Sequence, residues 1–211
     1  MNPAIFEIFS DTPVASSVFL VFIALSLYTM FKNQSLMYQL MLHPFSFSKG
    51  ERIYTIITSG FVHADIGHLL FNSVTFFFFA FPLERTVGSF AFFLIYFLSL
   101  ILSDVPTIIR NRNNPDYRSL GASGAISGVL FSFIIFYPTT PISMLLFPIG
   151  IPAYLFAVLY TVYCIWADKK GWGNINHNAH LWGGLIGFGL TAFLYPNYFF
   201  EFIGLFTNMF N

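Results

Sequence analysis

Six stretches of the chain are nearly free of charged residues and apolar enough to form membrane-spanning helices. They cover about residues 12–31, 67–83, 89–103 and 121–137, a run that begins near 148–152 and ends at 166, and residues 179–194. A helix needs ~20 mostly apolar residues to cross the hydrocarbon core, and backbone groups in lipid must be paired internally. The pattern predicts an all-α polytopic membrane protein, a compact bundle of six transmembrane helices in a single domain over residues 1–211.

Two features of this pattern stand out. Residues 32–64 form a long connection that mixes charged and moderately apolar pieces, and long ordered connections are often functional. The run at residues 121–137 would be a helix of roughly 25 Å, which is shorter than a hydrocarbon core of ~30 Å. One of its ends, near Ser123 or near Pro138, should therefore lie within the depth of the membrane.

Composition supports a membrane location and excludes some partners. The chain is 56% hydrophobic and 9% charged, with nine basic and nine acidic residues, so nothing suggests a surface for nucleic acid. The single cysteine, Cys164, excludes an internal disulfide and a cysteine-rich metal site, and we expect it to be a small packing residue. No cleavable signal peptide is evident, because residues 1–11 carry Glu7 and Asp11 but no basic residue.

A few polar side chains interrupt the apolar runs, and polar groups inside a membrane by default suggest function. His68 and Asn72 are four residues apart, hence on one helix face, Ser123 opens the fourth run, and His180 opens the sixth. All four lie near the beginnings of even-numbered helices, which start on the same side of the membrane in a six-span bundle. The topology therefore predicts that they converge in one layer.

These residue types fit acyl-transfer chemistry. A serine hydroxyl becomes a nucleophile when an imidazole takes its proton, and an oxyanion needs amide or backbone N–H donors. Asn72 and His68 offer side-chain donors, and a helix start offers free N–H groups. Because Asp65 and Asp168 lie outside the runs, a Ser–His dyad is favoured over a triad.

Glycine pairs offer a way to bring the two halves of such a dyad together. Gly124 and Gly128 form one small-xxx-small pair, and Gly183 and Gly187 form another. Such pairs let helices in lipid approach closely. We therefore expect the fourth helix to pack on the sixth and to bring Ser123 to His180.

The motifs "HADIGHLLFN", "GASG" and "AHLWGGLIG" occur in this order along the chain. They resemble those of the rhomboid family of intramembrane serine proteases, over about residues 50–189, and "LERTVGS" resembles that family's Glu-containing turn between the second and third spans. The resemblance implies that Ser123 is the nucleophile and His180 the general base. It implies an oxyanion role for Asn72 and His68. It also implies supporting roles for Gly121, Gly124 and His63.

The resemblance implies an intramembrane serine endopeptidase that cleaves transmembrane segments of membrane proteins. Its partners would be transmembrane substrates and the lipid bilayer, with no nucleic acid, no cofactor and no metal. One alternative is a catalytically inactive rhomboid-like protein that binds transmembrane segments, although such members would be expected to lack the serine or the histidine. A metal site among His63, His68, His177 and His180 has less support, because zinc motifs such as HExxH and cysteine ligands are missing from it.

The distribution of basic residues and the family resemblance predict opposite orientations of the protein in the membrane. The loops on the expected active-site side carry eight basic residues: Lys32, Lys49, Arg52, Arg110, Arg112, Arg118, Lys169 and Lys170. The opposite side carries Arg85. The positive-inside rule would place the active site toward the cytoplasm, whereas plain six-span rhomboids usually place it on the extracytoplasmic side. We follow the family and expect a multi-pass protein of the cell membrane with an extracytoplasmic active site.

Overall fold

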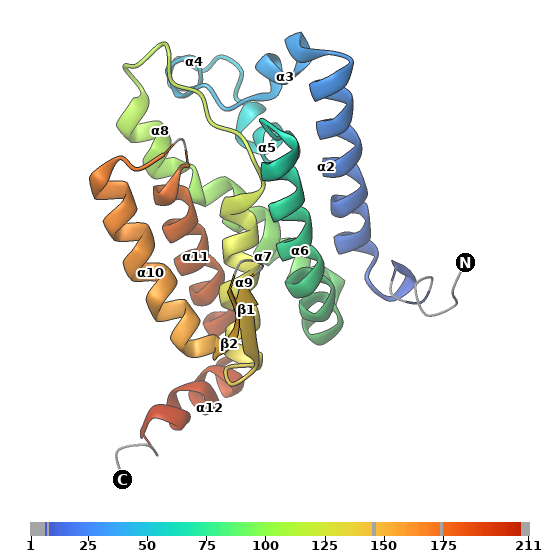
Figure 1. Cartoon of the computed structure of the whole chain (residues 1–211), viewed down its shortest axis with the longest axis vertical. Helices are drawn as coiled ribbons and strands as arrows, with labels where there is room; N and C mark the ends of the chain where they lie inside the picture. The colour runs from blue at the N-terminus through green and yellow to red at the C-terminus, as the bar shows by residue number, and fades with distance from the viewer. Residues whose placement is uncertain (1–6, 8, 145–146, 174, 208–211) are drawn as a thin grey trace.

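A computed structural model describes residues 7, 9–144, 147–173 and 175–207. The chain is mainly helical (Figure 1). In order, the helices and strands are α2 (Pro13–Phe31), α3 (Gln34–Leu40), α4 (Pro44–Phe47), α5 (Thr55–Thr58), the 3-10 helix η1 (Ser59–Phe61), α6 (Ile66–Val87), α7 (Ser89–Ser103), α8 (Val105–Asn111), α9 (Ser123–Phe136), β1 (Pro141–Met144), β2 (Phe147–Pro152), α10 (Ala153–Lys170), α11 (His177–Leu194) and α12 (Pro196–Thr207).

The predicted runs correspond to α2, α6, α7, α9, α10 and α11, which confirms a polytopic helical bundle. Within the described residues, three stretches are long and apolar enough to cross a membrane by length and composition. They are Pro13–Phe31, Ile66–Val87 and Ser89–Asn111, the last of which runs through α7 and α8. The helix α9 is shorter but also apolar.

The second helix does not end at Leu83, as the charged pair after it suggests, but continues to Val87. The reason is that Glu84 is buried, at 1% exposure. Its carboxylate oxygens accept hydrogen bonds from the backbone N–H groups of Val14 (3.1 Å) and Ala15 (2.6 Å). These are free donors in the first turn of α2, where a negative charge is favourable, so Glu84 fastens α2 to α6.

Two features in the C-terminal half of the chain, a pair of strands and a last helix, were not predicted from the sequence. The strands β1 and β2 pair antiparallel, with Pro141 opposite Pro152 and Ile142 opposite Ile151. The apolar sequence there looks like the start of a span, but the prolines remove helix hydrogen bonds, and the fifth helix begins only at Ala153. The chain also continues after Leu194 into α12, because Pro196 is tolerated at a first helical position.

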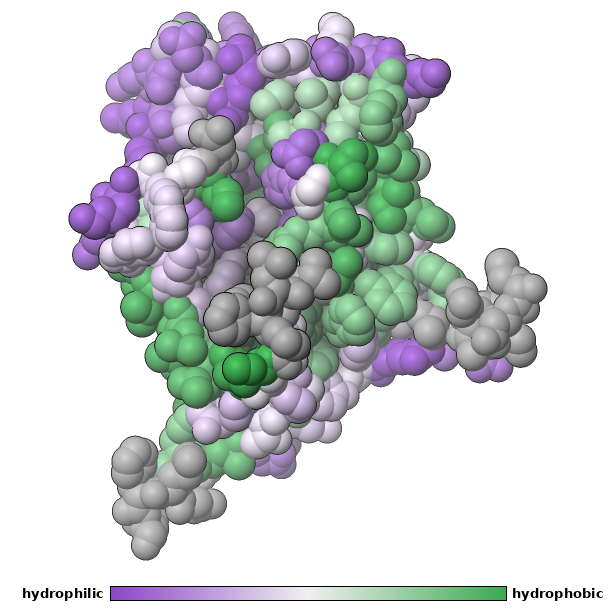
Figure 2. Space-filling view, in the orientation of Figure 1, coloured by the Kyte–Doolittle hydropathy of each residue, from purple (hydrophilic) through white to green (hydrophobic). Residues whose placement is uncertain are grey.

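The helix α9 lies at the centre of the bundle, packed against α6, α7 and α11. Every residue from Gly124 to Ile135 is buried, as expected for a helix that is apolar all round. Large apolar side chains such as those of Phe78, Phe90 and Phe193 are exposed on the outer helices. Figure 2 shows the resulting hydrophobic band below a hydrophilic cap formed by the loops, which is the surface expected of a protein embedded in lipid.

Candidate active site

Ser123 is the first residue of α9, which starts part-way down the bundle in Figure 1, below the upper end of α2. The Ser123 end of the short helix is thus recessed relative to the upper end of the bundle. The first intrahelical hydrogen bond is donated by the N–H of Ile126 to the carbonyl of Ala122 at 2.9 Å. The N–H groups that precede it are the free donors of a helix start, and they surround Ser123.

The first loop fixes the segment that leads to Ser123. Leu42 and Ser119 exchange two backbone hydrogen bonds of 2.9 and 3.1 Å, and the N–H of Gly121 donates to the carbonyl of Ser59 at 2.9 Å. Gly121 has a φ of 115°, a backbone conformation that favours glycine. The long loop, expected to be functional, therefore holds the entry to α9 in place.

Ser123 and His180 face each other across the contact of α9 with α11. The Ser123 Oγ lies 2.6 Å from the His180 Nε2. A Cβ added to Gly183 would collide with the carbonyl of Gly124, and one added to Gly187 would collide with the carbonyl of Gly128. The predicted close approach of the two glycine pairs is thus confirmed, and it places serine and imidazole within hydrogen-bonding distance.

The other nitrogen of His180 bonds a residue that the sequence analysis does not single out. The Nδ1 of His180 lies 3.1 Å from the hydroxyl of Tyr160 on α10, which lies 3.1 Å from the Oγ of Ser127. If the Nδ1–H donates to Tyr160 and Tyr160 donates to Ser127, the Nε2 keeps a lone pair for the proton of Ser123. The only sequence feature that could have pointed to Tyr160 is a hydroxyl group inside an apolar run, and the same run contains other tyrosines.

His68 and Asn72 project from α6 toward the residue two positions before Ser123. A Cβ on Gly121 would lie 2.7 Å from the His68 Cε1, 2.8 Å from its Nε2 and 3.7 Å from the Asn72 Nδ2. Both side chains therefore flank the Gly121 backbone at the start of α9. The structure brings together in one region the residues that the topology places in one layer.

His63 accepts a hydrogen bond from Asn72 and holds the Asn72 side chain in position. The Asn72 Nδ2 donates to the His63 Nε2 at 2.8 Å, the His63 Nδ1 lies 2.8 Å from the Ser26 Oγ, and that hydroxyl donates to the Phe61 carbonyl at 3.3 Å. His63 and Asn72 are both buried, at 0% and 2% exposure. The chain of hydrogen bonds ties the position of the Asn72 amide to α2 and to the first loop.

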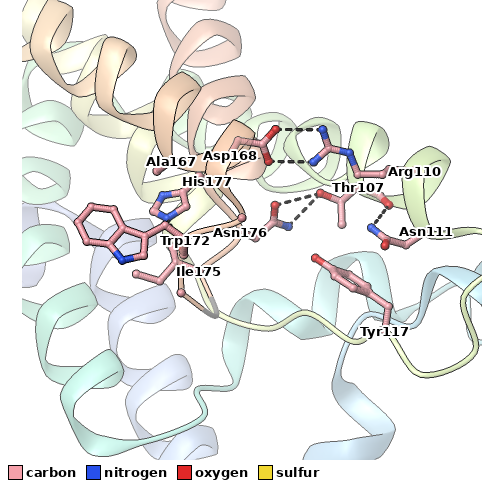
Figure 3. Close-up of a pocket in the computed structure, with 12 residues that line it drawn as sticks. Thr107, Arg110, Asn111, Tyr117, Ala167, Asp168, Trp172, Ile175, Asn176 and His177 are labelled. Atoms are coloured by element: carbon pink, nitrogen blue, oxygen red, sulfur yellow. Dashed lines mark hydrogen bonds and ion pairs between the residues drawn. The ribbon is translucent and has the colours of Figure 1, made fainter.

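A surface cavity of about 180 Å³ lies near this region, between α8, the ends of α10 and α11 and the loop that joins them (Figure 3). Arg110 and Asp168 make a two-pronged ion pair across it, with N–O distances of 2.8 and 3.0 Å. The hydrogen bond from Arg110 holds the pKa of the Asp168 carboxyl below its usual range. Asp168 is thus engaged with α8, and among the described residues no carboxylate hydrogen-bonds His180.

Comparisons with known proteins agree with the helical membrane bundle. Residues 50–197 match the Rhomboid domain family. The chain is 36% identical over 143 residues to Putative rhomboid protease YdcA of Bacillus subtilis. The matched region covers 67% of this chain and 66% of that protein. It is 27% identical over 175 residues to RHOMBOID-like protein 12, mitochondrial, of Arabidopsis thaliana, covering 76% of this chain and 52% of that protein.

A third relative is Rhomboid protein 1, mitochondrial, of Saccharomyces cerevisiae, which is 30% identical over 138 residues, 63% of this chain and 39% of that protein. The fold is that of a polytopic helical membrane protein, with a hydrogen-bonded Ser–His pair where α9 contacts α11. The chain belongs to the rhomboid family, a family that includes serine proteases and acts on membrane proteins in the bilayer. It spans between 39% and 66% of the length of these relatives.

Proposed function

We propose that the protein is an intramembrane serine endopeptidase that cleaves transmembrane segments of membrane proteins with a Ser123–His180 dyad. The observation that carries the proposal is the 2.6 Å distance between the Ser123 Oγ and the His180 Nε2, at the start of the most deeply buried helix. A nucleophile and its base within hydrogen-bonding reach, with the base oriented by a third group, is the arrangement of an activated serine. Tyr160 supplies that third contact.

The chemistry follows from the positions of these groups. The Ser123 Oγ attacks the substrate carbonyl carbon while the His180 Nε2 accepts the hydroxyl proton. Asn72, His68, the Gly121 region and the Ser123 amide stabilise the oxyanion. His180 then gives its proton to the leaving amine as the peptide C–N bond breaks and an acyl-serine ester remains. Water, deprotonated by the same imidazole, hydrolyses this ester, and no cofactor takes part.

The substrate and its membrane are part of the proposal. A helical peptide bond is shielded, so substrate helices must unwind locally, and Gly or Pro near the cleaved bond should help. We place the protein in the cell membrane with its active site on the extracytoplasmic side. Two of the relatives are named as mitochondrial, so another membrane of the cell is the competing location.

Trapping with a fluorophosphonate tests the nucleophile directly. The purified, detergent-solubilised protein is expected to form a covalent adduct at Ser123, mapped by mass spectrometry of its peptides, because His180 activates this hydroxyl. Labelling should be lost in His180→Ala and retained in Ser132→Ala, whose hydroxyl lies on the same helix and bonds the backbone carbonyls of Gly128 and Gly187. A folded protein that stays unlabelled, or an adduct elsewhere, overturns the proposal in favour of an inactive binder of transmembrane segments.

Tyr160 is assigned a positioning role, which Tyr160→Phe tests. Loss of one hydrogen bond of ~1 kcal/mol should lower kcat by up to about tenfold, with little change in KM. Tyr160 also accepts a stronger, charge-assisted bond from protonated His180, so the acidic limb of the pH–rate profile should move to lower pH. Tyr154→Phe on the same helix, where the ring packs on Phe206, should leave the profile unchanged. An unshifted profile in Tyr160→Phe contradicts the role.

A further inference from the structure

Three potential metal ligands, one of them His180, lie together at the contact of α10 with α11. They are Cys164 on α10 and His177 and His180 on α11, and one ligand atom of each lies within 4.8 Å of the others. Cys164 and His177 are buried, at 0% and 3% exposure. The sequence predicts only a packing role for Cys164, because the pattern does not reveal that its thiol comes to lie beside two histidines.

His177 is already held as a ligand would be. Its Nε2 lies 3.1 Å from the carbonyl oxygen of Trp172. A carbonyl only accepts hydrogen bonds, so the ring proton belongs on Nε2 and the lone pair on Nδ1. That Nδ1 is buried and has no hydrogen-bond partner in the described part of the chain. Metal-binding histidines commonly donate their second N–H to such a carbonyl, and an unpaired buried lone pair is costly unless something binds it.

We propose that Cys164, His177 and His180 form a binding site for a zinc ion, and that zinc bound there switches the dyad off. One thiolate and two imidazole nitrogens form a ligand set that zinc favours, with a fourth position left for water. Zinc–ligand distances are about 2.0–2.3 Å. Ligand atoms already within 4.8 Å of one another need only small side-chain rotations to reach a shared ion.

The proposed site adjoins a surface cavity. His177 and Trp172 line the surface cavity of about 180 Å³, together with Asp168 and Asn176. Figure 3 shows the His177 imidazole beside Trp172, near the ion pair of Asp168 with Arg110. The cavity gives an ion a way to approach His177 from the protein surface, and a metal site needs such an entry.

Inhibition follows from the tautomers and rests on the proposed function. In the active state the His180 Nδ1 carries a proton toward Tyr160, and the Nε2 lone pair faces Ser123. Zinc can bind Nδ1 only when the ring proton has moved from Nδ1 to Nε2, and an Nε2 that carries a proton can no longer accept the serine proton. Cys164 loses its thiol proton to water as the Zn–S bond forms, and no other proton is released.

Zinc binding is measured first without catalysis, by equilibrium dialysis of Ser123→Ala in detergent followed by metal analysis. One zinc per chain is expected. Adding Cys164→Ala or His177→Ala to this variant should weaken the Kd by about tenfold or more. The matched control His43→Gln removes an imidazole in the first loop, where His43 bonds Ser46 and Pro115, and should bind zinc as the parent does. Circular dichroism checks that each variant is folded.

Catalysis is measured second, in the unmodified protein and in Cys164→Ala. Zinc should inhibit cleavage of a model transmembrane substrate by the unmodified protein, EDTA should restore it, and Cys164→Ala should be active and resistant. Zinc binding equally well to every variant, or inhibition that persists in Cys164→Ala, overturns the zinc site. A protein that binds zinc through these ligands but never cleaves substrate contradicts the proposed function and leaves the site standing.

Discussion

Ser123→Ala is expected to abolish cleavage of a model transmembrane substrate while leaving the fold intact. Alanine removes the attacking oxygen, and no other described hydroxyl hydrogen-bonds the His180 Nε2. Loss of the nucleophile costs about a factor of 10⁶ in kcat in serine proteases that have been dissected by mutation, which is below the background of a gel-based assay. The measurement is cleavage of a reconstituted substrate in liposomes, followed over hours at matched protein amounts.

The control variants separate chemistry from folding. Ser123 is only half-buried, so its loss should not create a sizeable cavity, and the thermal unfolding midpoint should stay close to that of the unmodified protein. Ser132→Ala on the same helix should cleave normally. His180→Ala should match Ser123→Ala, and the double variant should be no worse than either, because residues that act as a unit are not additive. Undiminished turnover in Ser123→Ala would rule out the dyad.

Much of the site could be predicted because membrane topology constrains it strongly. Apolar runs set the helices, and the alternating direction of successive helices places His68, Asn72, Ser123 and His180 at one end of the bundle. The glycine spacing then predicts which helices touch, and the structure shows the Gly183–Gly124 and Gly187–Gly128 contacts. These inferences need only periodicity and direction, which are local properties of the chain.

What escaped prediction depends on side-chain rotation and on distant partners. Tyr160 and Cys164 look like ordinary residues of an apolar run, and only the packing of α10 on α11 turns both toward His180. In the sequence, Glu84 suggests an exposed charge at the end of a helix. In the structure it is buried, because the first turn of α2 donates two backbone N–H groups to its carboxylate. The paired strands β1 and β2 are as apolar as the start of a span, so hydropathy alone cannot distinguish strand from helix there.

Gly183→Val is expected to cause the second large loss, because the contact of α9 with α11 positions the dyad. Any side chain at Gly183 meets the backbone carbonyl of Gly124, and backbone cannot rotate away as a side chain can. The helices must separate, and His180, one turn before Gly183, should move away from Ser123. A misplacement of ~1 Å costs about 10²-fold in rate, so kcat should fall by at least that amount, with slower fluorophosphonate labelling.

Two further glycines of α11 show whether distance or general destabilisation causes this loss. A Cβ at Gly189 meets nothing within 4 Å, so Gly189→Val should retain activity and stability. Gly187→Val meets the carbonyl of Gly128 in the same way but one turn further from His180. It should lower the unfolding midpoint about as much as Gly183→Val while reducing kcat less, because the helices can open at the far contact and keep the dyad together. Equal losses of activity in the Gly183 and Gly187 variants would mean that these contacts stabilise the bundle without setting the distance between Ser123 and His180.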